Sequence, residues 1–228
     1  MSAAKVLRWE RRPDERIPEL LEAALEVFAK NGYRNTRLDD VADEAGVTKG
    51  TIYHYFDTKE ELLLGVIAHY QALALGRVED VLRDEGLTAA ERIRLVVRRT
   101  FADRPKSSRY LLSLLIRDIA HEVPRAHERW LRDGPVRLWT LIGGIVDEGT
   151  RRGEFRSDAD GLVAARDLIS ALLLQLMWQQ HAAAVPGLAI DENRLIDSAV
   201  ELFLAGLRRP PPKRKAQVRT AAAARRKS

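Results

Sequence analysis

The sequence predicts an all-α protein, and three observations lead to that prediction. Alanine, leucine, arginine and glutamate dominate the 228 residues, and all four are good helix formers. Apolar side chains recur at the three- and four-residue spacing of amphipathic helices along most of the chain. No convincing stretch shows the two-residue alternation that would indicate a strand. We therefore expect helices packed on helices, without a sheet.

Capping residues, glycines and prolines divide the chain into helices. Thr36, Thr48 and Thr58 are expected to cap three of them, because a threonine hydroxyl can accept a hydrogen bond from the free amides of the first turn. Gly134 and Pro135 should interrupt another helix. The predicted helices cover residues 16–31, 36–45, 48–55, 58–83, 88–102, 108–122, 125–152, 160–184 and 191–207.

The charge of the chain is unevenly distributed. The formal net charge is +5, but nine Lys and Arg residues and no acid lie from residue 208 onward, which leaves 29 bases against 33 acids elsewhere. The high pI therefore describes the tail and says little about the folded part. The tail either adds nonspecific attraction to phosphates or is a dispensable, solvated extension.

Several classes of site and protein are not expected. Without cysteine, there is no disulfide, cysteine nucleophile or thiolate metal site. The five histidines lack metal-ligand spacing, and neither a glycine-rich phosphate loop nor a nucleophile elbow is visible, so we expect no metal, no cofactor and no enzyme. The sequence has no secretory signal and no run of 18 apolar residues, so a cytoplasmic protein without a membrane span is expected.

Residues 36–56 read TRLDDVADEAGVTKGTIYHYF, a pattern typical of a helix-turn-helix. Gly46 suits the tight corner between two short helices. The second helix begins with small or cationic residues that can reach base edges or phosphates from its N-terminus: Thr48, Lys49, Gly50 and Thr51. Tyr53 and His54 follow, and both can donate hydrogen bonds to phosphate oxygens. Double-stranded DNA is therefore the expected partner.

This segment and the helix before it resemble the DNA-binding domain of the TetR family of bacterial transcriptional regulators. The resemblance runs without a gap from Arg16 to Leu62. The matching residues are Leu20, Leu21, Ala23, Ala24, Phe28, Gly32, Tyr33, Thr36, Val41, Ala42, Ala45, Gly46, Val47, Thr48, Gly50, Ile52, Tyr53, Tyr55, Phe56, Lys59, Glu60 and Leu62.

The resemblance implies roles for particular residues. Tyr53 and Lys59 match positions that clamp the DNA backbone in the family, and residues 48–51 match positions that read bases or adjoining phosphates. Arg37 stands where Thr or Ser is common, and it either adds a phosphate contact or is a solvated surface residue. His54 faces DNA or is a surface histidine, and Lys59 has the alternative of a plain lysine at a helix start.

The resemblance also implies a homodimer with about nine helices per chain. We expect a flexible arm over residues 1–15, a helix-turn-helix DNA-binding domain over 16–60, a helical regulatory domain over 61–207 and a disordered basic tail over 208–228. The last two long helices are apolar nearly all round, which indicates burial against a partner chain. Pairing these two helices from each subunit would give a four-helix bundle.

A small-molecule pocket is expected between the central helices of the regulatory domain. Arg117 and His121 lie four residues apart and either hold an anionic head group or form surface contacts. The candidate lining residues are Phe101, Tyr110, Leu114, Arg117, His121, Trp130, Trp139, Met177, Trp178 and His181. The expected function is repression of a palindromic operator, relieved by a ligand; the alternatives are an activator, a ligand-independent DNA-binding protein or, from another class, an enzyme or carrier.

Overall fold

The computed structural model describes residues 13–104, 111, 114, 119, 122–182 and 185–208. These residues form helices and no β-strand, so the expected all-α fold class is confirmed. The α-helices are α1 (Pro13–Asn35), α2 (Leu38–Ala45), α3 (Lys49–Tyr55), α4 (Lys59–Gly76), α5 (Glu79–Arg83), α6 (Ala89–Val97), α9 (Pro124–Leu131), α10 (Arg137–Arg152), α11 (Gly161–Ala182) and α12 (Glu192–Leu207). Two π-helical turns, η2 (Arg98–Ala102) and η4 (Arg132–Val136), follow α6 and α9.

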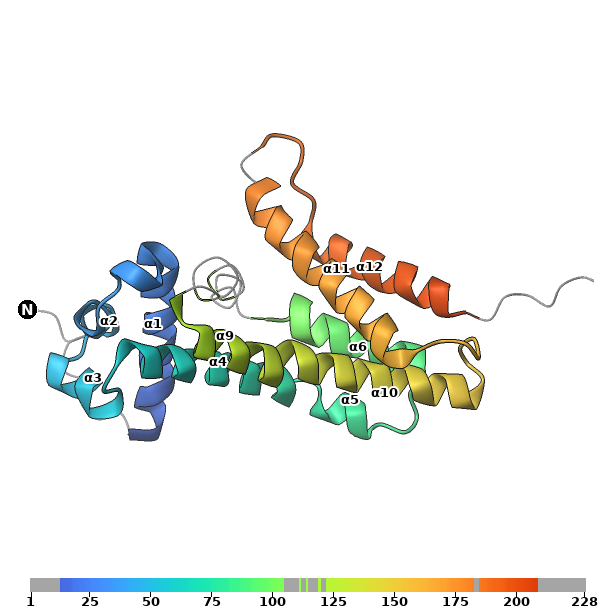
Figure 1. Ribbon diagram of the computed structural model, residues 1–228, viewed down its shortest axis with the longest axis horizontal. Coiled ribbons are helices and arrows are strands. Elements are labelled where there is room, and N and C mark those ends of the chain that lie inside the picture. Colours follow the sequence, from blue (N-terminus) through green and yellow to red (C-terminus); the bar gives the residue numbers. More distant parts are fainter. Residues whose placement is uncertain are drawn as a thin grey trace, which may run out of the picture.

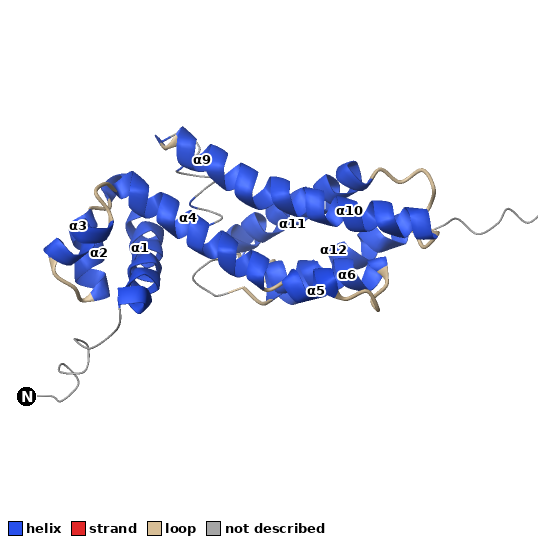
Figure 2. Cartoon of the chain, turned by 90° about the horizontal axis from the view of Figure 1, so that it is seen from below, coloured by secondary structure: helices blue, strands red, loops and turns tan. Residues whose placement is uncertain are grey.

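The helices form an elongated molecule with a small head at one end (Figure 1). The head consists of α1, α2 and α3, and α4 runs from it along the body. α9, η4 and α10 follow one another along the body, with α9 against α4, as Figure 2 shows from another side. α11 packs against α10 and α12, and its C-terminal end projects away from the body.

Two clusters of buried apolar side chains hold the helices together. The first joins α1–α4 to α9, and the second joins α5, α6, α10, α11 and α12. Leu62 and Val66 of α4 are buried in the first cluster, whereas Leu75 near the end of α4 packs against the second. Because full burial of one such side chain contributes about 1.5–3 kcal/mol, α4 is fixed at both of its ends.

Three threonine caps form, but the prediction for Thr36 is wrong. The hydroxyls of Thr48, Thr58 and Thr88 each accept a hydrogen bond from the amide three residues later. Thr36 is instead buried, and its hydroxyl donates to the carbonyl of Gly32 at 2.8 Å. Arg37 is the N-cap residue of α2, and its amide donates to the carboxylate of Asp40 at 2.7 Å. The Thr36 hydroxyl is therefore engaged with the end of α1 and does not cap α2.

One of the predicted helix breaks is present in the structure, and a second break occurs where a continuous helix was predicted. The expected interruption at Gly134 and Pro135 is present, as the π turn η4. The long fourth helix does not reach residue 83, because α4 ends at Gly76 and α5 starts at Glu79. Gly76 is the weak point, since glycine is about 1 kcal/mol less favourable in a helix than alanine.

α11 contains no run of 18 apolar residues, but it has one stretch of high mean hydropathy. Its residues Gly161–Gln179 form a 19-residue stretch of mean hydropathy 1.4, long and apolar enough by length and composition alone to cross a membrane. One third of that stretch is buried within the chain. Leu168 and Leu172 account for part of this burial in the second cluster, whereas Leu174 and Trp178 are exposed.

Candidate nucleic-acid interface and internal cavity

The corner between α2 and α3 requires a glycine. Gly46 has φ 64° and ψ 36°, in the left-handed region that costs L side chains energy. Its amide donates to the carbonyl of Asp43 at 3.1 Å, and the amide of Val47 donates to that of Ala42 at 2.9 Å. These bonds end α2 and turn the chain into α3 within three residues.

One face of α3 is fixed by packing and the opposite face is open. Ile52 is fully buried in the first cluster, and Phe56 packs against that cluster at the end of the helix. Tyr53 is 49% exposed, whereas Tyr55 is half-buried. Four further predicted residues are exposed on or beside this helix: Thr48, Lys49, Gly50 and His54.

The first turn of α3 is ordered by its own polar groups. The Thr48 hydroxyl accepts from the amide of Thr51 at 3.2 Å and lies 2.9 Å from the Thr51 hydroxyl. The ammonium of Lys49 donates to Asp39 of α2, and this hydrogen bond raises the pKa of Lys49 above its ordinary value. A phosphate that contacts Lys49 must therefore compete with the Asp39 carboxylate.

Gly50 has no internal reason to be glycine. A Cβ atom built on it would meet only the Thr48 hydroxyl, at 3.9 Å, which is an ordinary contact. Glycine in a helix costs stability relative to alanine. Because no atom of the chain needs the space beside Gly50, we expect the reason for a glycine here to lie in a molecule that contacts α3. The backbone of α3 is thus open to close approach at its N-terminus.

Lys59 makes contacts that the sequence did not indicate. Its Nζ atom donates to the carbonyls of Tyr33 at 2.7 Å and Arg34 at 3.0 Å, and lies 4.4 Å from the centre of the Tyr33 ring. Burial lowers the pKa of Lys59. Lys59 therefore fastens the start of α4 to the end of α1, while Arg37 is exposed at the start of α2.

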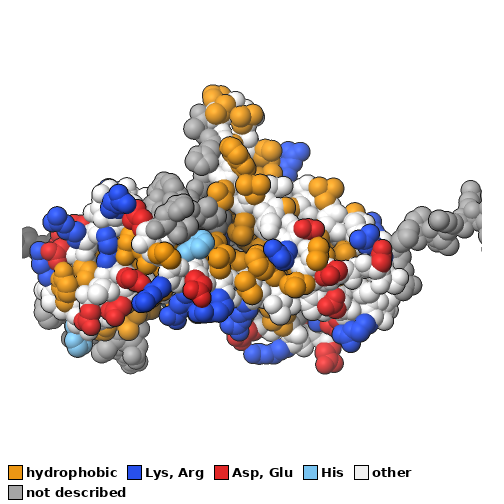
Figure 3. All heavy atoms as spheres, viewed as in Figure 1, with side chains coloured by type: hydrophobic (Ala, Val, Ile, Leu, Met, Phe, Trp, Pro, Cys, Tyr) orange, Lys and Arg blue, Asp and Glu red, His pale blue; other side chains and the backbone are white. Residues whose placement is uncertain are grey.

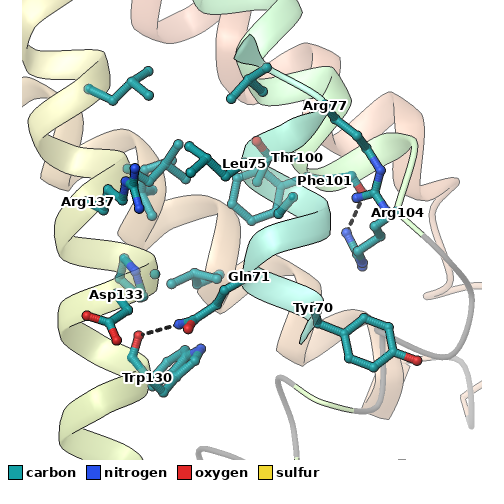
Figure 4. Close-up of a pocket in the computed structure, with 18 of the residues that line it drawn as sticks. Tyr70, Gln71, Leu75, Arg77, Thr100, Phe101, Arg104, Trp130, Asp133 and Arg137 are labelled. Carbon is teal, nitrogen blue, oxygen red and sulfur yellow. Dashed lines mark hydrogen bonds between the residues drawn. The ribbon is translucent and has the colours of Figure 1, made fainter. Parts of the chain in front are cut away.

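A cavity of about 190 Å³ lies in the body, bordered by α4, both π turns, α9, α10 and α11 (Figure 4). π turns occur frequently at functional sites, and here η2 contributes Thr100 and Phe101 while η4 contributes Asp133, Gly134 and Pro135. The remaining lining residues are Tyr70, Gln71, Ala74, Leu75, Arg77, Val78, Arg104, Leu111, Trp130, Arg137, Leu138, Leu141, Ile169, Leu173 and Leu176.

Two of the ten residues expected to line a pocket border this cavity, namely Phe101 and Trp130. Leu114 is buried in the first cluster, and Trp139 packs against the second, with the guanidinium of Arg166 5.2 Å from its ring centre. The structure does not bring these two into the cavity.

The other six candidates lie elsewhere or outside the described residues. Met177 is half-buried on α11, and Trp178 is 64% exposed, so neither borders the cavity. The backbone of His181 belongs to α11, but its side chain lies outside the description. Tyr110, Arg117 and His121 fall outside the described residues.

The cavity wall carries polar groups that were not expected. Arg104 donates to the carbonyl of Phe101 and pairs with Glu192 at the start of α12. Gln71 donates to the carbonyl of Trp130 at 2.9 Å. Arg77 and Arg137 also line the wall, and within the described ranges neither side chain has an ion pair. The wall is thus mostly apolar, and its charged groups are three arginines and the carboxylate of Asp133.

The fold and the open face of α3 define a helix-turn-helix protein with a separate internal cavity. The family model for bacterial regulatory proteins of the tetR family matches residues 20–66. The chain is 25% identical over 195 residues to the transcriptional repressor KstR2 of Rhodococcus jostii, covering 86% of this chain and 92% of that protein. It is 27% identical over 202 residues to the fatty acid metabolism regulator protein of Bacillus subtilis, covering 83% and 94%.

A solved structure extends the likeness to the body. The crystal structure of the regulator FadR from Bacillus subtilis, in complex with stearoyl-CoA, matches with a TM-score of 0.70 at 24% identity, covering 83% of this chain and 98% of that one. The head is similar to the DNA-binding part of tetR-family regulatory proteins, and the body to the fold of a solved regulator of fatty acid metabolism. The chain is a DNA-binding transcriptional regulator, and its relatives are regulators rather than enzymes.

Proposed function

We propose that this regulator is a homodimeric repressor that binds a palindromic operator and leaves it when an amphiphilic small molecule fills the cavity. The observation that carries the proposal is that α4 joins both functional parts. It starts at the Lys59 contact with α1 and ends in the cavity wall at Leu75. A ligand that favours a different position of α4 would change operator affinity by its differential affinity for the two positions.

The proposed DNA contacts divide between bases and phosphates. Residues 48–51 at the N-terminus of α3 enter the major groove, with Gly50 allowing close approach. Tyr53 and His54 donate to phosphates from the exposed face, and Arg37 reaches the backbone from α2. For Lys59 we propose a positioning role, since two of its three N–H groups already bind carbonyls of α1.

The proposed dimer forms through α11 and α12. Apolar side chains are exposed along both helices, and Figure 3 shows apolar surface on the projecting end of α11. They are Leu162, Val163, Leu174, Trp178 and Leu202. Burial against the same surface of a second copy would remove them from water. A two-fold dimer would also set two α3 helices about 34 Å apart, to read successive major grooves on one face of DNA.

The proposed ligand class is a long-chain acyl-coenzyme A. The cavity wall is mostly apolar and suits a hydrocarbon chain, while Arg77 and Arg137 suit anionic phosphates. The names of two relatives, one in fatty acid metabolism and one bound to stearoyl-CoA, support this choice. We further propose the division into a DNA-binding domain (residues 16–60) and a regulatory domain (61–207), acting in the cytoplasm.

The test begins with selection of genomic fragments that the full chain binds, followed by titration of the best fragment with stearoyl-CoA. We expect a palindrome, two chains per site by sedimentation, and weaker DNA binding with stearoyl-CoA but not with coenzyme A alone. Tyr53→Phe should weaken binding without changing sedimentation. Stearoyl-CoA that strengthens DNA binding would contradict induction and favour an activator, and no effect of either compound would favour a ligand-independent regulator.

A further inference from the structure

Gln71 connects two helices at the wall of the cavity. It lies on α4, and its Nε2 atom donates to the backbone carbonyl of Trp130 in α9 at 2.9 Å (Figure 4). Gln71 and Trp130 both line the cavity. Because both residues line the cavity, a molecule bound there would contact this hydrogen bond directly.

Pro135 of the π turn η4 lies five residues after the accepting carbonyl. In a π turn the amide of residue 135 would donate five residues back, to the carbonyl of Trp130. Pro135 has no amide hydrogen, so it cannot make that bond. The Gln71 amide donates to this carbonyl from the neighbouring helix.

The Gln71 amide packs directly against the backbone of Gly134. A Cβ atom on Gly134 would lie 2.7 Å from Gln71 Nε2, closer than real Cβ contacts come. The amide is therefore confined between Gly134 and the Trp130 carbonyl. A change in the spacing of α4 and α9 breaks this hydrogen bond instead of stretching it gradually, since hydrogen bonds weaken steeply away from good geometry.

Both helices joined by this bond also contact the head. α4 begins at Lys59, whose ammonium binds carbonyls at the end of α1. Glu122, just before α9, pairs with Arg34 of α1 across 3.4 Å. The distance between α4 and α9 at the cavity is thus linked to two contacts with the same end of α1.

We propose that Gln71 is a positioning residue whose hydrogen bond to Trp130 holds α4 against α9 in the DNA-binding arrangement, and that a ligand filling the cavity breaks this bond. The inference rests on the proposed acyl-coenzyme A response. It predicts an unusual direction: removal of a polar residue from the cavity wall makes ligand binding tighter, because the ligand no longer has to break the bond. Because both effects come from one hydrogen bond, the gain in ligand affinity and the loss in operator affinity without ligand multiply to the factor that this bond contributes.

The test compares Gln71→Met, which keeps the length of the side chain and removes the donor, with the wild-type chain. We expect stearoyl-CoA to bind more tightly and the operator fragment more weakly, with the two factors multiplying to about fivefold, as the loss of one net hydrogen bond implies. DNA affinity at saturating stearoyl-CoA should be unchanged. A merely structural role would weaken DNA binding equally with and without ligand, and that result would overturn the proposal.

A second variant and a control complete the design. Gly134→Ala displaces the same amide without removing it, so it should reproduce the Gln71→Met shifts. The control is Thr140→Val, at an exposed position of α10, which follows η4 directly. It removes a 3.0 Å hydrogen bond from the Thr140 hydroxyl to the Val136 carbonyl and should change neither affinity. Wild-type protein that ignores stearoyl-CoA would refute the proposed ligand class and this inference together. A wild-type response that both variants retain in full would refute this inference alone.

Discussion

The helix-turn-helix and the cavity are built in opposite ways. The first consists of consecutive residues, 36–56, and its polar contacts are local: Thr48 binds Thr51, and Lys49 binds Asp39 ten residues away. The cavity wall takes residues from 70 to 176, and its polar contacts span long distances in sequence, such as the 59 residues between Gln71 and Trp130. A local site can be altered without disturbing the body, whereas a dispersed site depends on how the helices pack.

This difference predicts that variants of each region affect one function and spare the other. Residues at the junction of head and body are the exception, because they belong to both. Four substitutions test this comparison, and they follow in order of decreasing expected effect.

Lys59→Met should have the largest effect, because Lys59 supports the head from outside the helix-turn-helix. It removes two hydrogen bonds to carbonyls and a contact with the Tyr33 ring, so the free energy of unfolding should fall by about 2 kcal/mol. Urea unfolding measures this loss, and amide exchange should show it at the end of α1. Weaker operator binding with an unchanged unfolding free energy would instead indicate a direct phosphate contact.

Gly50→Ala should separate DNA binding from stability. Alanine should raise the free energy of unfolding by up to about 1 kcal/mol, because its Cβ meets no close atom of the chain. Operator affinity should fall about tenfold as the methyl group blocks close approach. Gly144→Ala is the matched control, since its Cβ meets nothing within 4 Å on α10, and it should stabilise without affecting DNA binding. Equal operator affinity in both variants would remove Gly50 from the DNA face.

Arg137→Gln should weaken ligand binding and leave operator binding without ligand unchanged. Arg137 is an exposed cation at the cavity wall, so its loss should raise the dissociation constant of stearoyl-CoA about fivefold, and less at high salt. Isothermal titration at two salt concentrations measures both effects. Arg151→Gln, at the exposed end of the same helix, is the control. An equal loss in both variants would point to general electrostatic attraction instead of a site at the wall.

Glu201→Gln should have the smallest effect and tests a long-range pair of the body. Glu201 Oε1 accepts from Arg94 Nε at 2.6 Å, and this hydrogen bond lowers the pKa of Glu201 below 4.5. A carboxylate whose pKa is lower in the folded than in the unfolded state stabilises the fold at pH values above its unfolded pKa. This stabilisation is lost as the pH falls through the folded pKa. The variant should therefore show a shallower loss of stability as the pH falls below 4.5, the ordinary pKa of a glutamate. An unchanged acid slope would mean that the exposed pair contributes nothing.

The sequence predicted the head well because its determinants are local. Threonine caps, the Gly46 corner and the buried stripe act within one or two turns, and the resulting helices closely follow the expected ranges. The contacts of Thr36 and Lys59 with the end of α1 were not predicted, because side-chain bonds to these carbonyls exist only after the helices pack.

The cavity was poorly predicted because periodicity does not distinguish the two apolar faces of a helix. α11 places Leu173 and Leu176 toward the cavity, but Leu174 and Trp178 on its exposed side. A sequence pattern can identify Trp178 as apolar without indicating which surface will cover it. Gln71 gave no signal either, since its role depends on Pro135, which lies far along the chain.

The first apolar cluster has a practical consequence for building hybrid regulators. It continues past residue 60 into Leu63 and Ile67 of α4, and also includes Ile119 and Ala126 from a distant part of the chain. A head transplanted with residues 16–60 alone would leave its apolar underside facing foreign side chains. Swaps of operator specificity are therefore better made by grafting the exposed residues of α3 than by exchanging whole heads.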